Sequence, residues 1–354
     1  MSLPSTSQLR LAVVFGGRSS EHGVSCLTAA NVLQVVDHER FDVTPIGITL
    51  DGDWVRESAS WPDLAPGTLP AVRPEMPPFA WDDLSDFDVV LPLLHGPWGE
   101  DGTIQGLFEM AGVHYVGAGV LASSVAMDKP FTKTVFAASG LPQIPYVTVH
   151  PRDWERERAR VVARVKALGL PVFVKPARAG SSSGVMMVDS WDELESAVEK
   201  ARGFDPKVLV EAAVRGKREL ECGVIQQLDG TAVASVVGEI VVQEGTAHEF
   251  YDFEAKYLDG TSTNLVPADI PDVLSDRIRT YAVQAFEAIG CEGLARVDFF
   301  LNGDGELVVN EINTMPGFTP YSMFPLLWEA SGLTYAELVD RLLQLALDRP
   351  LGLR

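Results

Sequence analysis

The chain has 354 residues, too many for one ordinary domain, so we expect two or three domains. Its net charge is −21, from 28 Lys and Arg against 49 Asp and Glu, and such an acidic surface argues against nucleic acids and anionic membranes as main partners. The 3 cysteines are far apart and form no CxxC pair, and no apolar run is long enough to span a bilayer. We therefore expect a cytoplasmic protein without nucleic-acid or membrane partners.

The first part of the chain, residues 1–118, has the pattern of an α/β domain with a parallel sheet. Three apolar runs predict strands at 9–15, 41–50 and 87–96. One helix is predicted at 24–36. Residues 56–80 are rich in proline and polar side chains, which is typical of a surface excursion. Functional loops in such a domain leave the carboxyl ends of the strands.

Two further regions, residues 119–214 and 215–354, have the mixed pattern of α+β modules. In the first we expect helices at 159–169 and 190–200, the latter from a capping box at Ser190, and strands at 171–177, 185–188 and 208–214. In the second we expect strands at 221–227 and 232–242, a helix that stops at Gly290, a hairpin at 294–313 and a final helix at 335–347. Residues 245–269 form a long polar segment with clustered aromatics, which predicts a lid.

The hairpin at 294–313 carries a polar face. Strand alternation places Arg296 and Asp298 on one face with Glu311 and Asn313. In the simplest register across the Asn-Gly-Asp-Gly turn, Arg296 lies opposite Glu311 and Asp298 lies on the neighbouring diagonal. Two carboxylates and an amide oxygen on one face predict a Mg²⁺ site beside a phosphate-bearing ligand. A solvated outer face with an Arg–Glu ion pair explains these residues equally well.

A Gly/Ser-rich loop follows the strand that ends near Lys175. Its backbone N–H groups and hydroxyls could hold phosphate oxygens, with the lysine adding positive charge. The loop is not a Walker A sequence, and a Gly/Ser run alone is more often a surface turn. Lys129 has no assignment by itself. Glu211 and Glu219 offer acceptors for adenine and ribose, although Glu219 also fits a charged surface run.

Two loops in the first region are candidates for ligand contacts. Glu21 follows a strand-to-helix turn that lacks GxGxxG, so it either holds a substrate ammonium or favours the helix dipole. His95 opens a glycine-rich loop after a buried strand. That loop faces a ligand, or else Glu100 and Asp101 cap the following helix.

Two segments in the last region have the same ambiguity. Residues 251–257 place three aromatics in the expected lid, where Tyr257 either packs over a ligand or is an ordinary anchoring aromatic. After the hairpin, Gly317 allows close backbone approach to a ligand. Ser322 is either a carboxylate-binding hydroxyl or a helix cap.

Together these segments resemble the D-alanine–D-alanine ligases of the ATP-grasp superfamily, from Val13 to about Leu347. The matching strings, in the family's order, are FGGRSSEHGVS, LHGPWGEDG, MDK, FVKPARAGSSSG, YDFEAKY, ARVDFF, NEINTMPGF and TPYS. The resemblance implies an N-terminal parallel-sheet domain followed by a two-module ATP-grasp unit. It also implies ATP-dependent joining of two D-alanine molecules for cell-wall precursor synthesis.

The resemblance implies a role for each matching residue. Phosphates of ATP would be held by Lys129, Lys175 and the loop hydroxyls of Ser181, Ser182 and Ser183, and Lys256 would face the transferred phosphate. Glu211 would mark the adenine pocket and Glu219 the ribose hydroxyls. Two Mg²⁺ or Mn²⁺ ions would be bound by Asp298, Glu311 and Asn313.

The substrate side follows in the same way. Glu21 would anchor the ammonium of the first D-alanine, with His95 nearby, and Ser322 would bind the carboxylate of the second. Arg296 and the Gly317 N–H would stabilise the oxyanion. Ser181 and Tyr257 would join Glu21 in a hydrogen-bonded network that closes the lid.

The implied reaction passes through an acyl phosphate and releases ADP and phosphate, and the family is commonly dimeric. The pair Lys256-Tyr257 favours a D-alanine dipeptide over a D-lactate product, while Ala179 stands where many relatives have an acidic residue. Two other classes of protein are consistent with parts of the sequence. A nicotinamide oxidoreductase would explain the first strand–glycine–helix unit, and a catalytically silent nucleotide-binding regulator would bind ATP without turnover.

Overall fold

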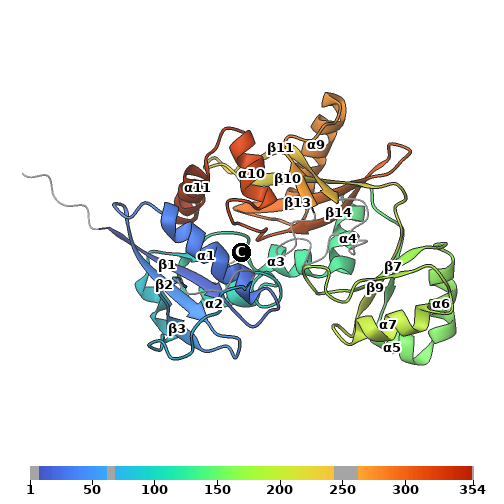
Figure 1. Ribbon diagram of the computed structural model, residues 1–354, viewed down its shortest axis with the longest axis horizontal. Coiled ribbons are helices and arrows are strands. Elements are labelled where there is room, and N and C mark those ends of the chain that lie inside the picture. The colour runs from blue at the N-terminus through green and yellow to red at the C-terminus, as the bar shows by residue number, and fades with distance from the viewer. Residues whose placement is uncertain (1–7, 62–67, 243–261, 353–354) are drawn as a thin grey trace, which may run out of the picture.

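The computed structural model describes residues 8–61, 68–242 and 262–352. Their strands form three sheets, each with its own helices (Figure 1). The expected fold class, α/β followed by α+β, is confirmed. The division into domains at 1–118, 119–214 and 215–354 stays a prediction. Within the described residues, no helix is both long and apolar enough to cross a membrane.

The first sheet has the order β3-β2-β1-β4-β5. Its strands are β1 (Leu9–Gly16), β2 (Phe41–Ile48), β3 (Trp54–Arg56), β4 (Val89–Pro92) and β5 (His114–Tyr115). All neighbours pair in parallel except β2 and the edge strand β3, which was not expected from the sequence. The helices of this region are α1 (His22–Val35), the 3-10 helix η1 (Trp81–Asp86) and α2 (Thr103–Ala111). The loops after β1 and β4 leave the same edge of the sheet, as parallel strands require.

The second sheet is antiparallel, with the order β6-β9-β7-β8. Its strands are β6 (Tyr146–Val149), β7 (Val172–Pro176), β8 (Met186–Val188) and β9 (Val208–Ala212). Helices α5 (Pro151–Arg156), α6 (Arg158–Lys166) and α7 (Leu194–Arg202) share one apolar core with it. The capping box expected at Ser190 is wrong, because the N-cap of α7 is Glu193 and makes no side-chain capping bond.

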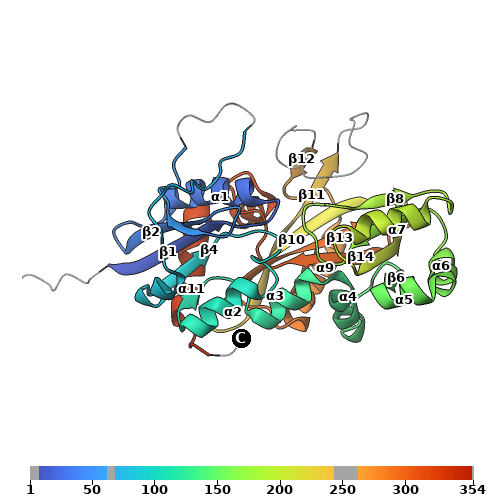
Figure 2. The ribbon, with the colours of Figure 1, turned by 90° about the horizontal axis from the view of Figure 1, so that it is seen from below.

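The third sheet has the order β12-β11-β10-β13-β14. Its strands are β10 (Arg218–Gln226), β11 (Ala232–Val242), β12 (Ser262–Leu265), β13 (Leu294–Leu301) and β14 (Leu307–Asn313). Helix α9 (Asp272–Ala288) packs on this sheet, and α3 (Val120–Met127) and α4 (Lys129–Ala138) lead from the first sheet toward the second (Figure 2). Helix α10 (Met323–Ala330) approaches the sheet at Gly238, where a Cβ would lie 2.6 Å from Met323 Sδ.

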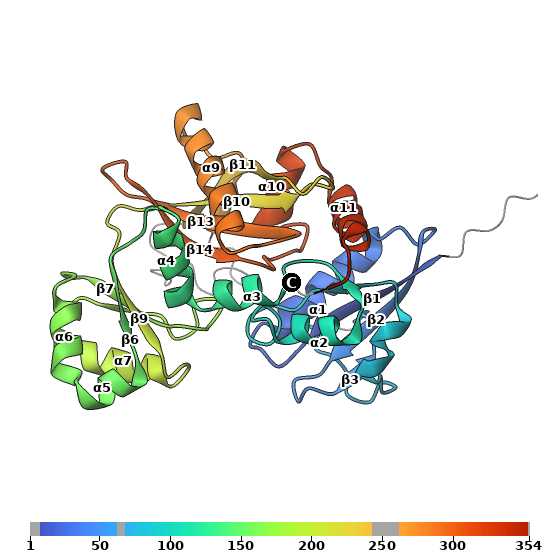
Figure 3. The ribbon, with the colours of Figure 1, turned by 180° about the vertical axis from the view of Figure 1, so that it is seen from behind.

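The last helix, α11 (Tyr335–Asp348), packs against the N-terminal part of the chain, as seen from behind in Figure 3. Leu338 and Leu342 of α11 share one buried cluster with Val13 and Phe15 of β1. The two ends of the described chain are thereby joined through a common core. This packing holds the loops of the first sheet over the polar face of the third.

Candidate active site

A cavity of about 670 Å³ lies where loops from all three sheets meet. Every candidate residue that the structure describes lines this cavity, namely Glu21, His95, Lys129, Lys175, Ser181, Ser182, Ser183, Glu211, Glu219, Arg296, Asp298, Glu311, Asn313, Gly317 and Ser322. Lys256 and Tyr257 lie outside the described residues, as does most of the expected lid at 245–269. The residues predicted from separate motifs are therefore brought to one place.

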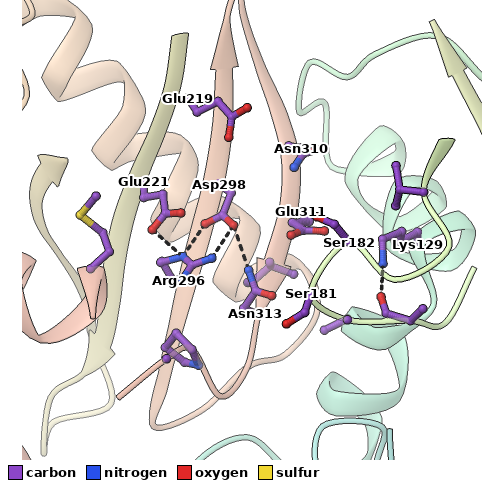
Figure 4. Close-up of a pocket in the computed structure, with 18 of the residues that line it drawn as sticks. Lys129, Ser181, Ser182, Glu219, Glu221, Arg296, Asp298, Asn310, Glu311 and Asn313 are labelled. Atoms are coloured by element: carbon purple, nitrogen blue, oxygen red, sulfur yellow. Dashed lines mark hydrogen bonds and ion pairs between the residues drawn. The ribbon is translucent and has the colours of Figure 1, made fainter. Parts of the chain in front are cut away.

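The hairpin provides one wall of the cavity, but its register differs from the simplest one. Arg296 lies opposite Asn313, and Asp298 lies opposite Glu311. A turn one residue longer and a bulge next to Asp298 cause the difference, since Asp298 pairs with Glu311 whereas Phe299 pairs with Val309. Figure 4 shows that Arg296, Asp298, Glu311 and Asn313 still share one face, as alternation predicted.

Arg296 is paired with carboxylates other than the expected Glu311. Its Nε donates to Asp298 Oδ1 and its Nη2 to Asp298 Oδ2, both at 2.7 Å. Its Nε also lies 2.8 Å from Glu221 Oε2. The solvated-surface interpretation of this face is wrong, because Asp298 and Glu221 are buried and line the cavity.

The donor set on the hairpin fits a hard divalent cation. Asp298 and Glu311 offer carboxylate oxygens on neighbouring strands. Asn313 donates from Nδ2 to Asp298 Oδ2 at 3.0 Å, which leaves its own Oδ1 as an acceptor. Among the described residues, no group of three His, Cys, Asp or Glu side chains has metal-site geometry, so a third protein ligand here would be the Asn313 amide.

The Gly/Ser loop after β7 forms the opposite wall. Ser181 and Ser182 have φ values of +47° and +58°, in the left-handed region. Loop conformations with successive inward N–H groups make concave anion sites. Lys129 donates from Nζ to Ala179 O at 2.8 Å, which ties the loop to the start of α4. Burial lowers the pKa of Lys129, although Glu311 opposes that shift.

Glu211 lies buried between two lysines. Its Oε2 is 2.6 Å from Lys175 Nζ, and its Oε1 is 2.6 Å from Lys133 Nζ. Burial alone would raise the pKa of Glu211, but the two ammonium groups outweigh burial and lower it to about 2. Lys133 was not singled out from the sequence. Its signal was the spacing of four residues from Lys129, which puts both lysines on one side of α4.

Glu219 on β10 has a lysine partner as well, Lys217 Nζ at 2.6 Å from its Oε1. Two residues further along the strand, Glu221 faces the same cavity. Glu221 was not singled out from the sequence. Strand alternation predicts that the side chains of Glu219 and Glu221 lie on the same face of β10. The contact of Glu221 with Arg296 could not be predicted, because it depends on the pairing of β10 with β13.

Glu21 is the N-cap of α1 but makes no capping hydrogen bond with its side chain. Its Oε1 instead accepts a hydrogen bond of 2.5 Å from Ser181 Oγ. A Cβ added at Gly96 or at Gly180 would lie 2.6 Å from Glu21 Oε2, so these two glycines provide the space that the carboxylate occupies. The helix-dipole explanation therefore does not account for the position of the Glu21 side chain.

His95 and Glu100 hold the backbone of Met315 from both sides. His95 Nδ1 lies 3.1 Å from Met315 O, and burial lowers the pKa of His95. Glu100 accepts from Gly96 N at 2.6 Å and from Met315 N at 3.1 Å. Burial, and next the nearby Glu21, raise the pKa of Glu100 to about 8. The expected capping role of Glu100 is wrong, since its oxygens bind these loop amides.

The segment after the hairpin lies at the end of the cavity near α10. Ser322 is the N-cap of α10 without a side-chain capping bond. Its Oγ accepts from Thr319 N at 3.1 Å and lies 2.8 Å from Thr319 Oγ1. The helix-cap reading of the Ser322 hydroxyl is therefore wrong, and Gly317 lines the cavity beside it.

Comparisons with known proteins identify the fold and the family. Models of the D-ala D-ala ligase N-terminus and C-terminus match residues 10–118 and 135–344. The D-alanine–D-alanine ligase of Paenarthrobacter aurescens is 51% identical, over 100% of this chain and 99% of its own length. The corresponding ligase of Kineococcus radiotolerans is 52% identical over 98% of each chain.

Solved structures agree with these relatives. The VanG D-Ala:D-Ser ligase from Enterococcus faecalis is 32% identical with a TM-score of 0.79, over 96% of this chain and 100% of that chain. The D-alanine–D-alanine ligase from Coxiella burnetii is 33% identical with a TM-score of 0.78, over 97% of this chain and 95% of that chain.

The fold is thus that of the ATP-grasp ligases. The chain belongs to the D-alanine–D-alanine ligase family and is an enzyme of that type. This membership overturns the nicotinamide oxidoreductase and silent regulator hypotheses.

Proposed function

We propose that this enzyme joins two D-alanine molecules with ATP and Mg²⁺, through an acyl phosphate, to supply a peptidoglycan precursor. The observation that carries the proposal is one cavity that brings together lysines, a Gly/Ser loop and an acidic hairpin, and that is also lined by Glu21 and Arg296. Family membership supports the choice of D-alanine.

The nucleotide occupies the side of the cavity formed by the second sheet. Lys129, Lys175 and the hydroxyls and N–H groups of Ser181–Ser183 bind the phosphates, and the positive charge balances phosphoryl oxygens. Glu211 and Glu219 accept from adenine and ribose. Lys256, outside the described residues, is assigned to the transferred phosphate by family resemblance.

The hairpin holds the divalent cations in this proposal. Asp298, Glu311 and Asn313 supply the protein ligands, and we assign them two Mg²⁺ or Mn²⁺ ions by family resemblance. When bound, the ions would neutralise the negative charge that develops on the phosphoryl oxygens.

The two amino acids occupy the side nearer the N-terminal sheet. Glu21, with His95 nearby, orients the first D-alanine by its ammonium. Ser322 binds the carboxylate of the second, while Arg296 and the Gly317 N–H stabilise the oxyanion at the reacting carbonyl. Ser181 and Glu21 close the site against water, which an acyl phosphate requires, and Tyr257, outside the described residues, is assigned to the same network by family resemblance.

The reaction consists of two displacements. A carboxylate oxygen of the first D-alanine attacks the γ-phosphorus of ATP, and the bond to the β-phosphate oxygen breaks to release ADP. The amine of the second D-alanine then attacks the acyl carbon, phosphate leaves, and the amine loses its proton. The residues that bind both substrates contribute mainly by holding the reacting atoms in line.

Cys26, Cys222 and Cys291 are buried thiols rather than disulfides, which supports a reducing cytoplasm as the location. A homodimer is proposed from family resemblance alone.

The test is release of ADP and phosphate by the purified enzyme, with the dipeptide identified by mass. D-alanine is tried alone and together with D-serine or D-lactate, because the relatives include a D-Ala:D-Ser ligase. We expect the D-alanine dipeptide as the main product. If release of ADP and phosphate requires D-serine or D-lactate, that compound and not D-alanine is the second substrate. If release does not depend on D-alanine, the proposal is overturned.

A further inference from the structure

Glu221 extends the acidic face of the hairpin by one strand. It lies opposite Asp298 across β10 and β13, and Asp298 lies opposite Glu311 across β13 and β14. Three carboxylates thus stand in one row across the sheet (Figure 4). Glu221 is 4% exposed and lines the cavity. A buried carboxylate is costly unless a positive group compensates it.

Arg296 compensates two carboxylates of this row, Asp298 and Glu221. Its Nε–H donates to Asp298 Oδ1 at 2.7 Å, and the same nitrogen lies 2.8 Å from Glu221 Oε2 in an ion pair. Because the sheet order is β10-β13-β14, Glu221 lies on the far side of Arg296 from Glu311 and Asn313. The guanidinium is therefore held between a carboxylate on the proposed metal side and one away from it.

Asp298 has two demands on its oxygens under the proposed function. It is a proposed ligand of the divalent cation, and both of its oxygens accept from Arg296. A cation and a guanidinium that seek the same oxygens compete for them. Glu221 is not assigned to the cation itself, because it lies on the far side of Arg296 from the proposed ligands Glu311 and Asn313.

We propose that Glu221 is a positioning residue, which keeps Arg296 in place and thereby leaves Asp298 available to the divalent cation. The inference rests on the proposed function, because it assumes a cation at Asp298. When Asp298 binds the cation, Glu221 continues to hold the guanidinium from the opposite strand. Arg296 then stays directed at the cavity while its attraction to Asp298 is weakened. Outer partners of this kind influence metal affinity without touching the metal.

The experiment measures Mn²⁺ binding to the full-length enzyme with ADP present, by the loss of the free Mn²⁺ signal in electron paramagnetic resonance. Glu221→Gln keeps the shape but removes the charge, so Arg296 turns fully to Asp298. We expect Mn²⁺ affinity to fall about 10-fold or more. Glu221→Asp, which keeps the charge, should restore part of the loss. We also expect kcat to fall with little change in the KM for ATP.

The matched control is Glu239→Gln. Glu239 is another buried carboxylate on this sheet, bonded by both oxygens to Arg218 at 2.7 and 2.6 Å, and neither residue lines the cavity. Its substitution removes the same charge and disrupts a similar ion pair. It should lower the melting temperature as Glu221→Gln does but leave Mn²⁺ affinity unchanged. An equal loss of affinity in both variants would overturn the proposal.

A double-mutant cycle distinguishes a positioning role of Glu221 from a direct effect of its negative charge on the cation. In an Arg296→Met background, Asp298 has no competitor, so adding Glu221→Gln should change Mn²⁺ affinity by less than about twofold. A full loss in that background would show that Glu221 acts by its charge alone and would overturn the positioning role. If wild-type enzyme with ADP binds no Mn²⁺, the metal site of the proposed function fails first. If the wild type binds and Glu221→Gln equals it, only the positioning role fails.

Discussion

Ser181 Oγ donates a hydrogen bond of 2.5 Å to Glu21 Oε1, although the two residues are 160 positions apart in the chain. The bond joins the Gly/Ser loop of the second sheet to the start of α1 on the first. The loop proposed to cover the phosphates is therefore in direct contact with the carboxylate proposed to hold the first D-alanine. Under the proposed function, the position of the Gly/Ser loop is linked to the position of the first D-alanine.

Ser181→Ala removes this link and should lower kcat about 100-fold, because a small misplacement of the reacting groups carries a large rate penalty. Steady-state phosphate release with D-alanine checks the effect. Ser190→Ala, in the turn before α7, is the control and should leave the rate unchanged. A rate for Ser181→Ala within twofold of wild type would contradict the role of the bond.

Gly180→Ala should weaken D-alanine binding. The added Cβ would lie 2.6 Å from Glu21 Oε2, so the carboxylate must move away from its place beside Ser181. We expect the KM for the first D-alanine to rise about 10-fold, roughly the effect of losing one charge-assisted hydrogen bond. Gly106→Ala is the matched control, because a Cβ in the middle of α2 meets no atom within 4 Å. Equal KM values for the two variants would refute the prediction.

Glu311→Gln should reduce turnover at least about 100-fold, since a metal ion at this kind of site contributes several kcal/mol to transition-state stabilisation. The fold should remain, as judged by an unchanged melting temperature. Chelation of divalent ions from the wild-type enzyme should have the same effect on turnover and should be reversed by Mg²⁺. Unchanged turnover in Glu311→Gln would remove its role as a metal ligand.

Lys133→Met should destabilise the fold in a pH-dependent way. It removes one of the two ammonium groups that hold the pKa of Glu211 at about 2, below the ordinary value of 4.5. The lowered pKa stabilises the native state above pH 4.5, and this contribution is lost as the pH falls through about 2. We expect a loss of about 3 kcal/mol in the free energy of unfolding at pH 7, the usual penalty for breaking a buried ion pair.

Urea unfolding of wild type and Lys133→Met at pH 7, and at several values below 4.5, measures that difference. The gap between the two proteins should narrow as the pH falls. Lys166→Met, at the end of α6, is the control: the ammonium of Lys166 lies 5.9 Å from the centroid of the Trp191 ring, and no ion pair with a described carboxylate is found for it. A gap that does not depend on pH would show that Lys133 acts through packing alone.

Glu100 should make stability fall as pH rises. Its pKa is raised from 4.5 to about 8, so between these values the native state keeps a proton that the unfolded chain has lost. The stabilisation is therefore complete below pH 4.5 and is lost as the pH rises toward about 8, by up to about 1.4 kcal/mol per pH unit. Urea unfolding at pH 5 to 8 measures the slope. Glu100→Gln should flatten it, and an unaltered slope in that variant would assign it to other groups.

Local pattern was sufficient for much of the site. Alternation alone placed Arg296, Asp298, Glu311 and Asn313 on one face, and the structure has them so (Figure 4). The partners of Arg296 and Asp298 could not be predicted, because one extra turn residue and one bulge each shift the register by one residue, and together they change the partners without altering the face. The packing of α11 on the N-terminal sheet was equally invisible, since its apolar stripe shows that it packs but not on what.

The sequence by itself determined the fold class, the family and many of the polar residues that line the cavity, because the loops after buried strands carry recognisable motifs. Only the tertiary structure decided which charges meet. Lys133 reaches Glu211, Glu221 reaches Arg296, and Glu100 reaches Met315 across elements that are distant in the chain. Such pairs form only when strands and helices pack against one another. Because a buried charge without a partner is costly, packing arrangements that pair the buried charges are favoured over those that do not.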